Sequence, residues 1–375
     1  MNPQEYLDSK NLWDLELLKL HAQNNSVYVI ESKRFPDLVM LHYMDACAYD
    51  NKWTEFSRMS RGLILDMRHR KVLAYPFDKF FNLGQMPETS YDSLLSLGSF
   101  ETVEKLDGSM CTLFKDPNTD KLTFTTKGSF DSEHGLYANN LEMSKEFWAV
   151  AETYASAGTL VFELVTKRFQ IVIDYAKKGY KEGLYLIGYR RNFSNEFASP
   201  LALTGMAEEL GIPTFKTYQF GSLDNLIDAA KTLPVLEEGF VLRFSGDLLV
   251  KVKGYAYLEM HRFISHLSDR NILQAVANNT ADDLAKLCPD EFKDEVMMKI
   301  AAFKERCREL SEICYTKYTE GPKENRKEFA AWVNQNVDRP LRGFVFQLMD
   351  GKELDQKRIY KTIEEIDHID GRTKI

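Results

Sequence analysis

The amino-acid sequence predicts an α+β fold with two domains, and three observations lead to that prediction. The chain has 375 residues, which is enough for two hydrophobic cores. Short β-rich runs bounded by turn residues dominate up to about residue 255. Beyond that point the apolar residues recur with a helical period. We therefore expect a strand-rich domain over residues 1–260 and an all-helical domain over residues 261–375.

The strands of the first domain are predicted from short apolar or alternating segments. Residues 38–43, 62–66 and 71–75 form a first group. Residues 110–115 and 122–126 flank the turn-rich segment 116–120, which is typical of a hairpin connection. Further strands are expected at residues 159–165, 170–174, 183–189, 239–244 and 248–252, and helices at 141–155 and 203–210.

The second domain is predicted from one long apolar stripe. Its members are spaced alternately by four and three residues: Val296, Ile300, Phe303, Cys307, Leu310 and Cys314. Residues 326–336 and 341–349 also indicate helices. We interpret the stripe as core packing and not as a cofactor site.

Composition narrows the class of protein. No apolar run approaches the roughly 18 residues that span a bilayer, and no secretory signal is visible. The cysteines form no closely spaced pair, so free thiols in a reducing, cytoplasmic setting are expected, with no membrane partner. The net charge of −8 argues against a protein that coats nucleic acid, but it permits a local basic site on an acidic body.

The segment Lys105-Leu106-Asp107-Gly108-Ser109 is the first candidate for chemistry. Asp-Gly is a common turn, so a solvated lysine beside a turn is the simpler interpretation of these five residues alone. A lysine nucleophile requires more, because deprotonating its amine at neutral pH costs roughly 4 to 5 kcal/mol. Nearby cations or a metal must lower its pKa, and carboxylates must hold that metal.

Other segments supply such groups. Lys251 and Lys253 alternate with valines, so both lysines point to one face of a strand, which could also be an ordinary exposed face. Glu163 interrupts a strongly apolar strand, where a carboxylate is costly unless it is paired or functional. Additional charged residues lie beside glycines or aromatic residues: Arg61, Lys79, Lys127 and Glu238, the last followed by Gly239.

The order of these segments resembles the covalent nucleotidyltransferase superfamily of ligases and capping enzymes. The matching motifs are Lys105–Gly108, Phe162-Glu163, Tyr185–Tyr189, Glu238-Gly239 and Lys251–Lys253. Within it, the chain most resembles the RNA ligase 1 family of T-even phages, on the basis of Arg61-Gly62, Lys79–Leu83, Lys127–Ser129 and a helical C-terminal domain. The motifs cover roughly residues 35–260, and the later domain is similar only in architecture.

The resemblance implies antiparallel sheets that enclose an ATP cleft, and an enzyme that joins 5′-phosphate and 3′-hydroxyl RNA ends. Lys105 would form a lysyl-AMP, and AMP would pass to the 5′-phosphate before the 3′-hydroxyl displaces it. Phosphate contacts would come from Arg61, Lys79, Lys127, Lys251 and Lys253. Mg²⁺ (or Mn²⁺) would be held, directly or through water, by Asp107, Glu163 and Glu238. Gly108 and Gly239 would permit close approach, and Phe162 or a neighbour would stack on adenine.

Alternatives on the same fold are a DNA ligase, an mRNA guanylyltransferase and a non-catalytic RNA-binding descendant. Two departures favour an RNA ligase. Met110 stands where DNA ligases usually have arginine, and helices begin near Tyr257, where those relatives continue into a β-barrel. The family also implies a role for the helical domain in repair of cleaved tRNA. No obligate protein partner is evident.

Overall fold

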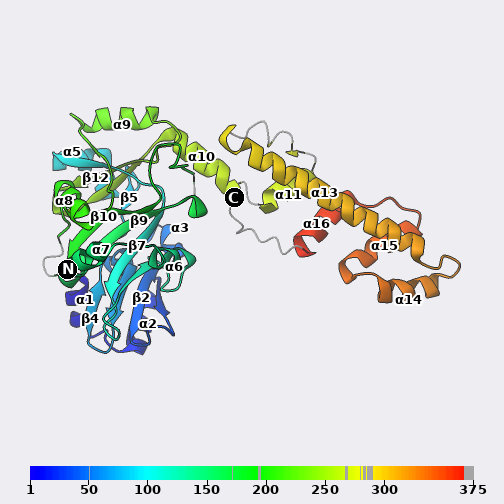
Figure 1. Ribbon diagram of the computed structural model, residues 1–375, viewed down its shortest axis with the longest axis horizontal. Helices are drawn as coiled ribbons and strands as arrows, with labels where there is room; N and C mark the ends of the chain where they lie inside the picture. The colour runs from blue at the N-terminus through cyan, green and yellow to red at the C-terminus, as the bar shows by residue number, and fades with distance from the viewer. Residues whose placement is uncertain are drawn as a thin grey trace. The chain divides into compact units, whose positions relative to one another are not determined.

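The computed structural model describes residues 1–49, 51–170, 172–192, 196–266, 269–278, 280–281, 284 and 290–366. The chain divides into two compact units, Met1–Leu258 and Glu259–Ile375. The first unit contains three sheets with helices against them (Figure 1). The fold of this unit is therefore α+β with largely antiparallel sheets, as the sequence predicts.

One sheet lies near the N-terminus and has the order β1-β2-β3-β4, with every neighbouring pair antiparallel. Its strands are β1 Val27–Glu31, β2 Leu38–Tyr43, β3 Arg61–Asp66 and β4 Lys71–Ala74. Helices α1 Pro3–Ser9, α2 Leu15–Asn24 and α4 Glu55–Met59 bury Leu7, Leu18 and Phe56 in a common core with this sheet. The short helix α3, Asp45–Tyr49, lies between β2 and α4 in the chain.

A second sheet has the order β10-β9-β7-β8. Its strands are β7 Ser109–Lys115, β8 Leu122–Thr126, β9 Gly158–Val165 and β10 Gly183–Arg191, all antiparallel. Helices α6 Glu133–Asn139, α7 Lys145–Ala157 and α8 Pro200–Leu210 pack against it. Phe162 in β9 packs against Phe147 of α7, so its neighbours Val161 and Glu163 point to the opposite face.

The third sheet has the order β11-β6-β12-β13-β5. Its strands are β5 Phe81–Asn82, β6 Phe100–Glu104, β11 Thr217–Tyr218, β12 Gly239–Phe244 and β13 Leu249–Lys253, and only the β13–β5 pair is parallel. Val250 and Val252 pack against helix α9, Leu223–Thr232, in a core that also receives Leu94 of α5, Tyr91–Leu97. The alternation of the strand therefore leaves Lys251 and Lys253 on the other face.

The second and third sheets face each other. Met110 and Val161 of the second sheet and Leu249 of the third belong to one hydrophobic cluster. Val161 shares its face with Glu163, and Leu249 shares its face with Lys251 and Lys253. Glu163 of the second sheet and Lys251 and Lys253 of the third therefore lie beside the same hydrophobic cluster, on faces that point toward each other.

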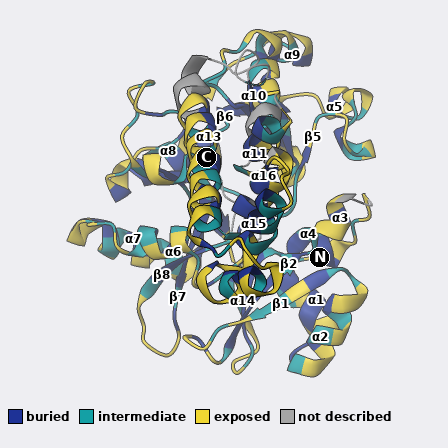
Figure 2. Cartoon of the chain, turned by 90° about the vertical axis from the view of Figure 1, so that its right-hand side faces the viewer, coloured by how far each residue is buried: buried dark blue, intermediate teal, exposed yellow. Residues whose placement is uncertain are grey.

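The second unit contains only helices among its described residues. These are the end of α10 Tyr255–His266, then α11 Asp269–Ala277, α13 Asp290–Glu320, α14 Arg326–Asn336, α15 Arg342–Met349 and α16 Gln356–Ile366. Helix α13 has an exposed side beside a buried one (Figure 2). Five members of the predicted stripe are buried, namely Val296, Ile300, Cys307, Leu310 and Cys314. The sixth, Phe303, is partly buried and packs against the same cores, so the stripe is core packing as predicted.

Most predicted elements match the structure within a few residues, but one strand was wrong. Residues 167–169 form a 3₁₀ turn, and the described part of 170–174 contains no strand. The helix predicted from residue 141 begins at Lys145, because the Ser144 side chain caps its first turn. The remaining 3₁₀ turns are Pro87–Thr89, Ser245–Asp247 and Arg339–Leu341.

None of the described helices has the length and apolar character needed to cross a lipid bilayer. Cys47, Cys111, Cys307 and Cys314 are buried and form no disulfide among the described residues, and Cys288 lies outside those residues.

Candidate active site

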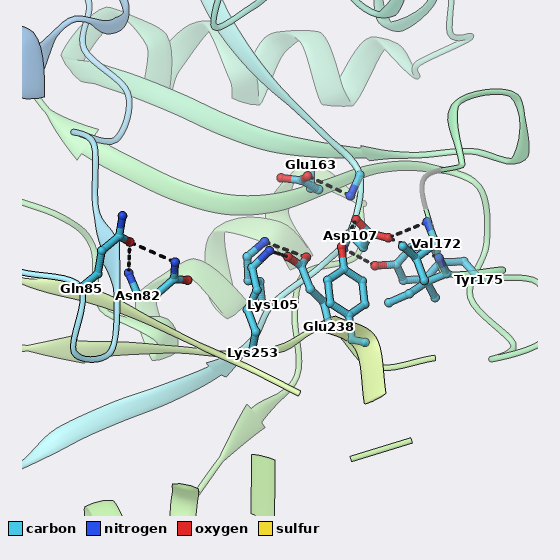
Figure 3. A network of polar contacts seen from close by, with 12 residues as sticks. Asn82, Gln85, Lys105, Asp107, Glu163, Val172, Tyr175, Glu238 and Lys253 are labelled. Atoms are coloured by element: carbon cyan, nitrogen blue, oxygen red, sulfur yellow. Dashed lines mark hydrogen bonds and ion pairs between the residues drawn. The ribbon is translucent and has the colours of Figure 1, made fainter. Parts of the chain in front are cut away.

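Lys105 lies in the connection between β6 and β7, and its side chain forms an ion pair (Figure 3). Its backbone amide donates to the Gly239 carbonyl at 2.9 Å, which fixes it beside the start of β12. Its Nζ donates to Glu238 Oε2 at 2.7 Å, while Lys253 Nζ lies 3.0 Å from Glu238 Oε1. Glu238 is 3% exposed, so one buried carboxylate holds two lysines.

The charge state of Lys105 follows from these neighbours. Burial lowers the pKa of its ammonium, but the Glu238 and Glu163 carboxylates outweigh burial, so the pKa is above its ordinary value. Burial likewise raises the pKa of Glu238, but Lys105 and Lys253 bring it below the ordinary range. From the sequence we expected nearby cations or a metal to lower the pKa of Lys105. The structure shows the opposite direction, because the charges of the Glu238 and Glu163 carboxylates outweigh burial and raise the pKa of Lys105.

Asp107 organises the backbone that follows Lys105. Its Oδ2 accepts hydrogen bonds from the Val172 and Ile173 amides at 3.1 and 3.2 Å. Its Oδ1 accepts from the Tyr257 hydroxyl at 3.1 Å, and its own amide donates to the Tyr175 hydroxyl. Asp107 is 6% exposed, so both of its oxygens are engaged within the protein. These contacts hold the 105–108 connection in place.

Gly108 and Gly239 allow close packing of neighbouring strands. A Cβ at Gly108 would lie 2.5 Å from the Leu164 carbonyl oxygen and 3.0 Å from Glu163 Cγ. At Gly239, where φ is +136°, a Cβ would lie 2.2 Å from the Val252 carbonyl oxygen. Both glycines therefore bring the strands that carry Glu163 and Lys253 close to Lys105.

Glu163 is the second carboxylate of the site. Its Oε1 accepts a hydrogen bond from the Gly108 amide at 3.0 Å. Burial raises the pKa of Glu163 to about 7, even though the Lys105 charge opposes that rise. The carboxyl group therefore keeps its proton to a higher pH than an exposed glutamate, and a cation that binds there would favour its charged form.

Four further cations, which we call the cation group, lie near Lys105: Arg61, Lys79, Lys127 and Lys251. Burial, with Arg61 and Lys105 adding repulsion, lowers the pKa of Lys251 well below its ordinary value. Burial and neighbouring cations also lower the pKa of Lys127, and they lower that of Lys79 to about 8. Within the described residues, no carboxylate oxygen lies within 4.0 Å of the ammonium groups of these three lysines. The cation group therefore repels itself unless an anion is present.

Aromatic rings position the cation group, and the sequence analysis did not identify most of them. The Lys79 ammonium lies 5.2–5.6 Å from the ring centres of Tyr43, Trp53 and Phe81. The Lys251 ammonium lies 4.3 Å from the ring centre of Phe80, and that ring is also 5.7 Å from the Arg61 guanidinium. Arg61 donates to the Met110 thioether at 2.9 Å. In the sequence, these rings were indicated only by the aromatic residues within Lys79–Leu83, namely Phe80 and Phe81.

Comparison with known proteins assigns the family. A model of the family described as RNA ligase matches residues 59–263, which is more than half of the chain and contains every site residue named above except those before residue 59. The chain belongs to the RNA ligase family. The resemblance drawn from the motifs is therefore confirmed.

Relatives of this RNA ligase family member span different lengths. It is 25% identical to the RNA ligase of Rhodothermus phage RM378, with 96% of each chain covered. It is 27% identical to a putative RNA ligase of Thermovibrio ammonificans, with 62% of this chain and 61% of the relative covered. A putative bifunctional polynucleotide kinase/RNA ligase of Autographa californica nuclear polyhedrosis virus is 29% identical over 61% of this chain, which spans only 34% of that relative.

Two solved structures of RNA ligases show a weak structural likeness to the chain. An archaeal ATP-dependent RNA ligase has 12% identity and a TM-score of 0.48, with 94% of this chain and all of that chain covered. A Naegleria gruberi RNA ligase with PPi has 16% identity and a TM-score of 0.33, with 44% and 51% covered. The assignment to the RNA ligase family rests on the sequence match.

Two expected roles need correction in this RNA ligase family member. Phe162 cannot stack on a nucleotide, because it is fully buried between Phe124 and Phe147 on the helix-covered face of its sheet. The described residues contain no group of three or more histidine, cysteine or acidic side chains arranged to hold a metal ion. Both oxygens of Asp107 accept hydrogen bonds from protein donors, and both oxygens of Glu238 are held by lysines. Of the three expected metal ligands, Glu163 is the one whose second oxygen has no hydrogen bond or ion pair among the described residues.

Proposed function

We propose that this protein is an ATP-dependent RNA ligase that joins a 5′-phosphate end to a 3′-hydroxyl end through a lysyl-AMP at Lys105. One observation carries the proposal most directly. Lys105 is half-buried beside a cation group that has no neutralising anion close to its lysines among the described residues. This arrangement fits a triphosphate with its α-phosphorus at Lys105 and its other phosphates at the cation group. The family assignment adds RNA as the substrate class.

The proposed reaction uses the residues of the site in three steps. Neutral Lys105 Nζ bonds to the α-phosphorus, and pyrophosphate leaves as its bond to that phosphorus breaks. The 5′-phosphate oxygen of the RNA then bonds to the same phosphorus, and the P–N bond breaks to return the lysine. Finally the RNA 3′-hydroxyl oxygen bonds to the 5′-phosphate phosphorus, and AMP leaves. The cation group would stabilise phosphate charge in each step.

Glu163, together with Glu238 once its two lysines turn to the triphosphate, would hold a hydrated divalent cation, because carboxylate oxygens are the ligands that Mg²⁺ and Mn²⁺ prefer. Such an ion would supply positive charge beside Lys105, lower the pKa of its ammonium and help to neutralise the triphosphate. Asp107 acts instead as a positioning residue that holds the 105–108 connection.

The experiment supplies the protein with Mg²⁺ and α-labelled ATP or GTP, then with 5′-phosphorylated RNA or DNA strands. Labelling by ATP and joining of RNA are expected. Labelling by GTP alone would indicate a capping enzyme, and joining of nicked DNA in preference to RNA would indicate a DNA ligase. A protein that binds RNA without any labelling would be the non-catalytic descendant.

We also propose that the helical unit selects the RNA, with cleaved tRNA as its class of substrate. Every candidate site residue lies before Leu258, and the helical unit has a core of its own. A truncated protein that ends after His266 keeps α10, and it should still be labelled by ATP and lose preference for a cleaved anticodon stem-loop over linear RNA. Failure of the folded truncated protein to be labelled would contradict this division of roles.

A further inference from the structure

A cavity of about 390 Å³ adjoins the cation group within the first unit. Lys79 and Phe80 line it, and Phe80 also contacts Lys251 and Arg61 on the catalytic side. Leu249, which shares a strand face with Lys251 and Lys253, lies in the cavity wall. The cavity therefore borders the face of β13 that carries Lys251 and Lys253. It lies at the Leu249 end of the strand, whereas Lys105 lies at the Lys253 end. Its volume is sufficient for one nucleoside.

Apart from Lys79, which belongs to the cation group, the arginines in the cavity wall are paired with carboxylates. Arg58 pairs with Glu88 at 2.6 Å, and Arg190 lies 3.3 Å from Asp78 Oδ2. Asp247 adds a further carboxylate at the turn before β13. The carboxylates beside Arg58 and Arg190 repel a phosphate but accept hydrogen bonds from the amino groups of a base or the hydroxyls of a ribose. The cavity therefore suits a neutral nucleoside, and the cation group beside it suits the phosphate of that nucleoside.

Arg58 provides a flat surface in this wall. Its guanidinium lies 5.1 Å from the centre of the Phe81 ring and is held by Glu88, and its side chain is 35% exposed. Nucleic-acid bases stack on guanidinium planes as they do on aromatic rings. The Arg58 carbonyl also accepts a hydrogen bond from the Lys79 amide at 2.8 Å, so the backbone segments that carry Arg58 and Lys79 lie side by side.

We propose that this cavity binds the 5′-terminal nucleoside of the RNA strand that receives AMP, with its base on Arg58 and its 5′-phosphate at Lys79 and Lys251. The inference rests on the proposed function and adds to it a site for one end of the substrate. ATP and the RNA end would use the cation group in successive steps, but only the RNA nucleoside would enter the cavity.

The test measures single-turnover transfer of AMP from purified, AMP-labelled enzyme to a 5′-phosphorylated oligoribonucleotide. Wild type is compared with Arg58→Met, which removes the plane and the charge, and with Arg58→Lys, which keeps the charge alone. Each enzyme is given the intact oligonucleotide and one whose 5′-terminal nucleotide is abasic. Labelling by ATP and the melting temperature of each variant are measured in parallel.

Both variants should be labelled by ATP as well as wild type. Both should need roughly tenfold more intact RNA for half-maximal transfer, which corresponds to the loss of one stacking contact. With the abasic strand, all three enzymes should behave alike, because the base is already missing.

Three results would overturn the inference. Full rescue by Arg58→Lys would show a phosphate contact and not stacking. Equal effects of the variants on intact and abasic strands would show that the base does not contact Arg58. Normal transfer by both variants would show that the cavity is not used. If wild type itself acquired no label from ATP, the proposed function would fail and the inference would fail with it, whereas the other three results leave the proposed function intact.

Discussion

Lys105 Nζ lies 2.7 Å from Glu238 Oε2, so the proposed nucleophile forms an ion pair in the ligand-free protein. An ammonium held by a buried carboxylate keeps its proton and cannot attack phosphorus. Binding of the triphosphate and a divalent cation must therefore weaken this pair before reaction. The ion pair would limit reaction of Lys105 with other electrophiles while the site contains no nucleotide.

Replacement of Glu238 by glutamine should make Lys105 more reactive in the absence of ATP. Loss of the carboxylate charge removes the main cause that raises the pKa of Lys105, so the neutral fraction of its amine should increase. The measurement is the rate of acylation of the Lys105 peptide by an amine-directed reagent between about pH 7 and 10. Exposed Lys231, which pairs with Asp228, serves as the internal reference. An unchanged rate at Lys105 would mean that Glu238 does not control its protonation.

Replacement of Lys251 by methionine should separate activity from stability. Lys251 is crowded by other cations without a carboxylate close to it among the described residues, so its removal should leave the free energy of unfolding unchanged or increase it by about 1 kcal/mol. Labelling by ATP should fall by roughly 100-fold or more, because a charge aimed at the phosphates is lost. Urea unfolding and the rate of labelling test the two effects, with Lys231→Met as the surface control. A parallel loss of stability and activity would indicate a structural role.

Replacement of Asp107 by asparagine should act through folding. Asn can accept only part of the hydrogen bonds from Val172, Ile173 and Tyr257, so we expect a loss of about 1 to 3 kcal/mol in the free energy of unfolding. The Mg²⁺ concentration for half-maximal labelling should remain close to that of wild type. A large shift in that concentration with an unchanged melting temperature would instead identify Asp107 as a metal ligand.

Glu163 should give the ligand-free protein a specific pH dependence. Its pKa in the folded protein is about 7, above the ordinary value of 4.5, so the folded state binds the proton more tightly than the unfolded state. Stability from this group is fully present below about pH 4.5 and is lost as the pH rises through about 7. The melting temperature of wild type relative to Glu163→Gln should therefore fall over this range and become constant above it. A constant difference between the two proteins throughout would contradict the raised pKa.

The sequence predicted those parts of the site that depend on local pattern. The alternation of β13 placed Lys251 and Lys253 on one face, and the structure shows both on the face opposite Val250 and Val252. The same alternation, applied to β9, excludes Phe162 from any site that contains Glu163, so that error was avoidable.

Other parts of the site depend on contacts between distant segments. The partners of Asp107 come from residues 172–173, Tyr175 and Tyr257, and no spacing rule connects them to residue 107. The apolar character of 170–174 predicted a strand, whereas in the fold the amides of Val172 and Ile173 donate to a carboxylate and not to a neighbouring strand. The aromatic rings around Lys79 likewise come from three separate segments, at Tyr43, Trp53 and Phe81.

The covalent bond between Lys105 and AMP is the most direct test of the whole account. The protein is incubated with Mg²⁺ and α-labelled ATP without RNA, digested, and the labelled peptide is identified by mass spectrometry. The account predicts one adenylylated residue, Lys105, with an acid-labile P–N bond, and no label in Lys105→Ala or in Lys105→Arg, whose guanidinium stays protonated. Persistent labelling of folded Lys105→Ala, or a modified peptide that lacks residue 105 in the wild type, would contradict it.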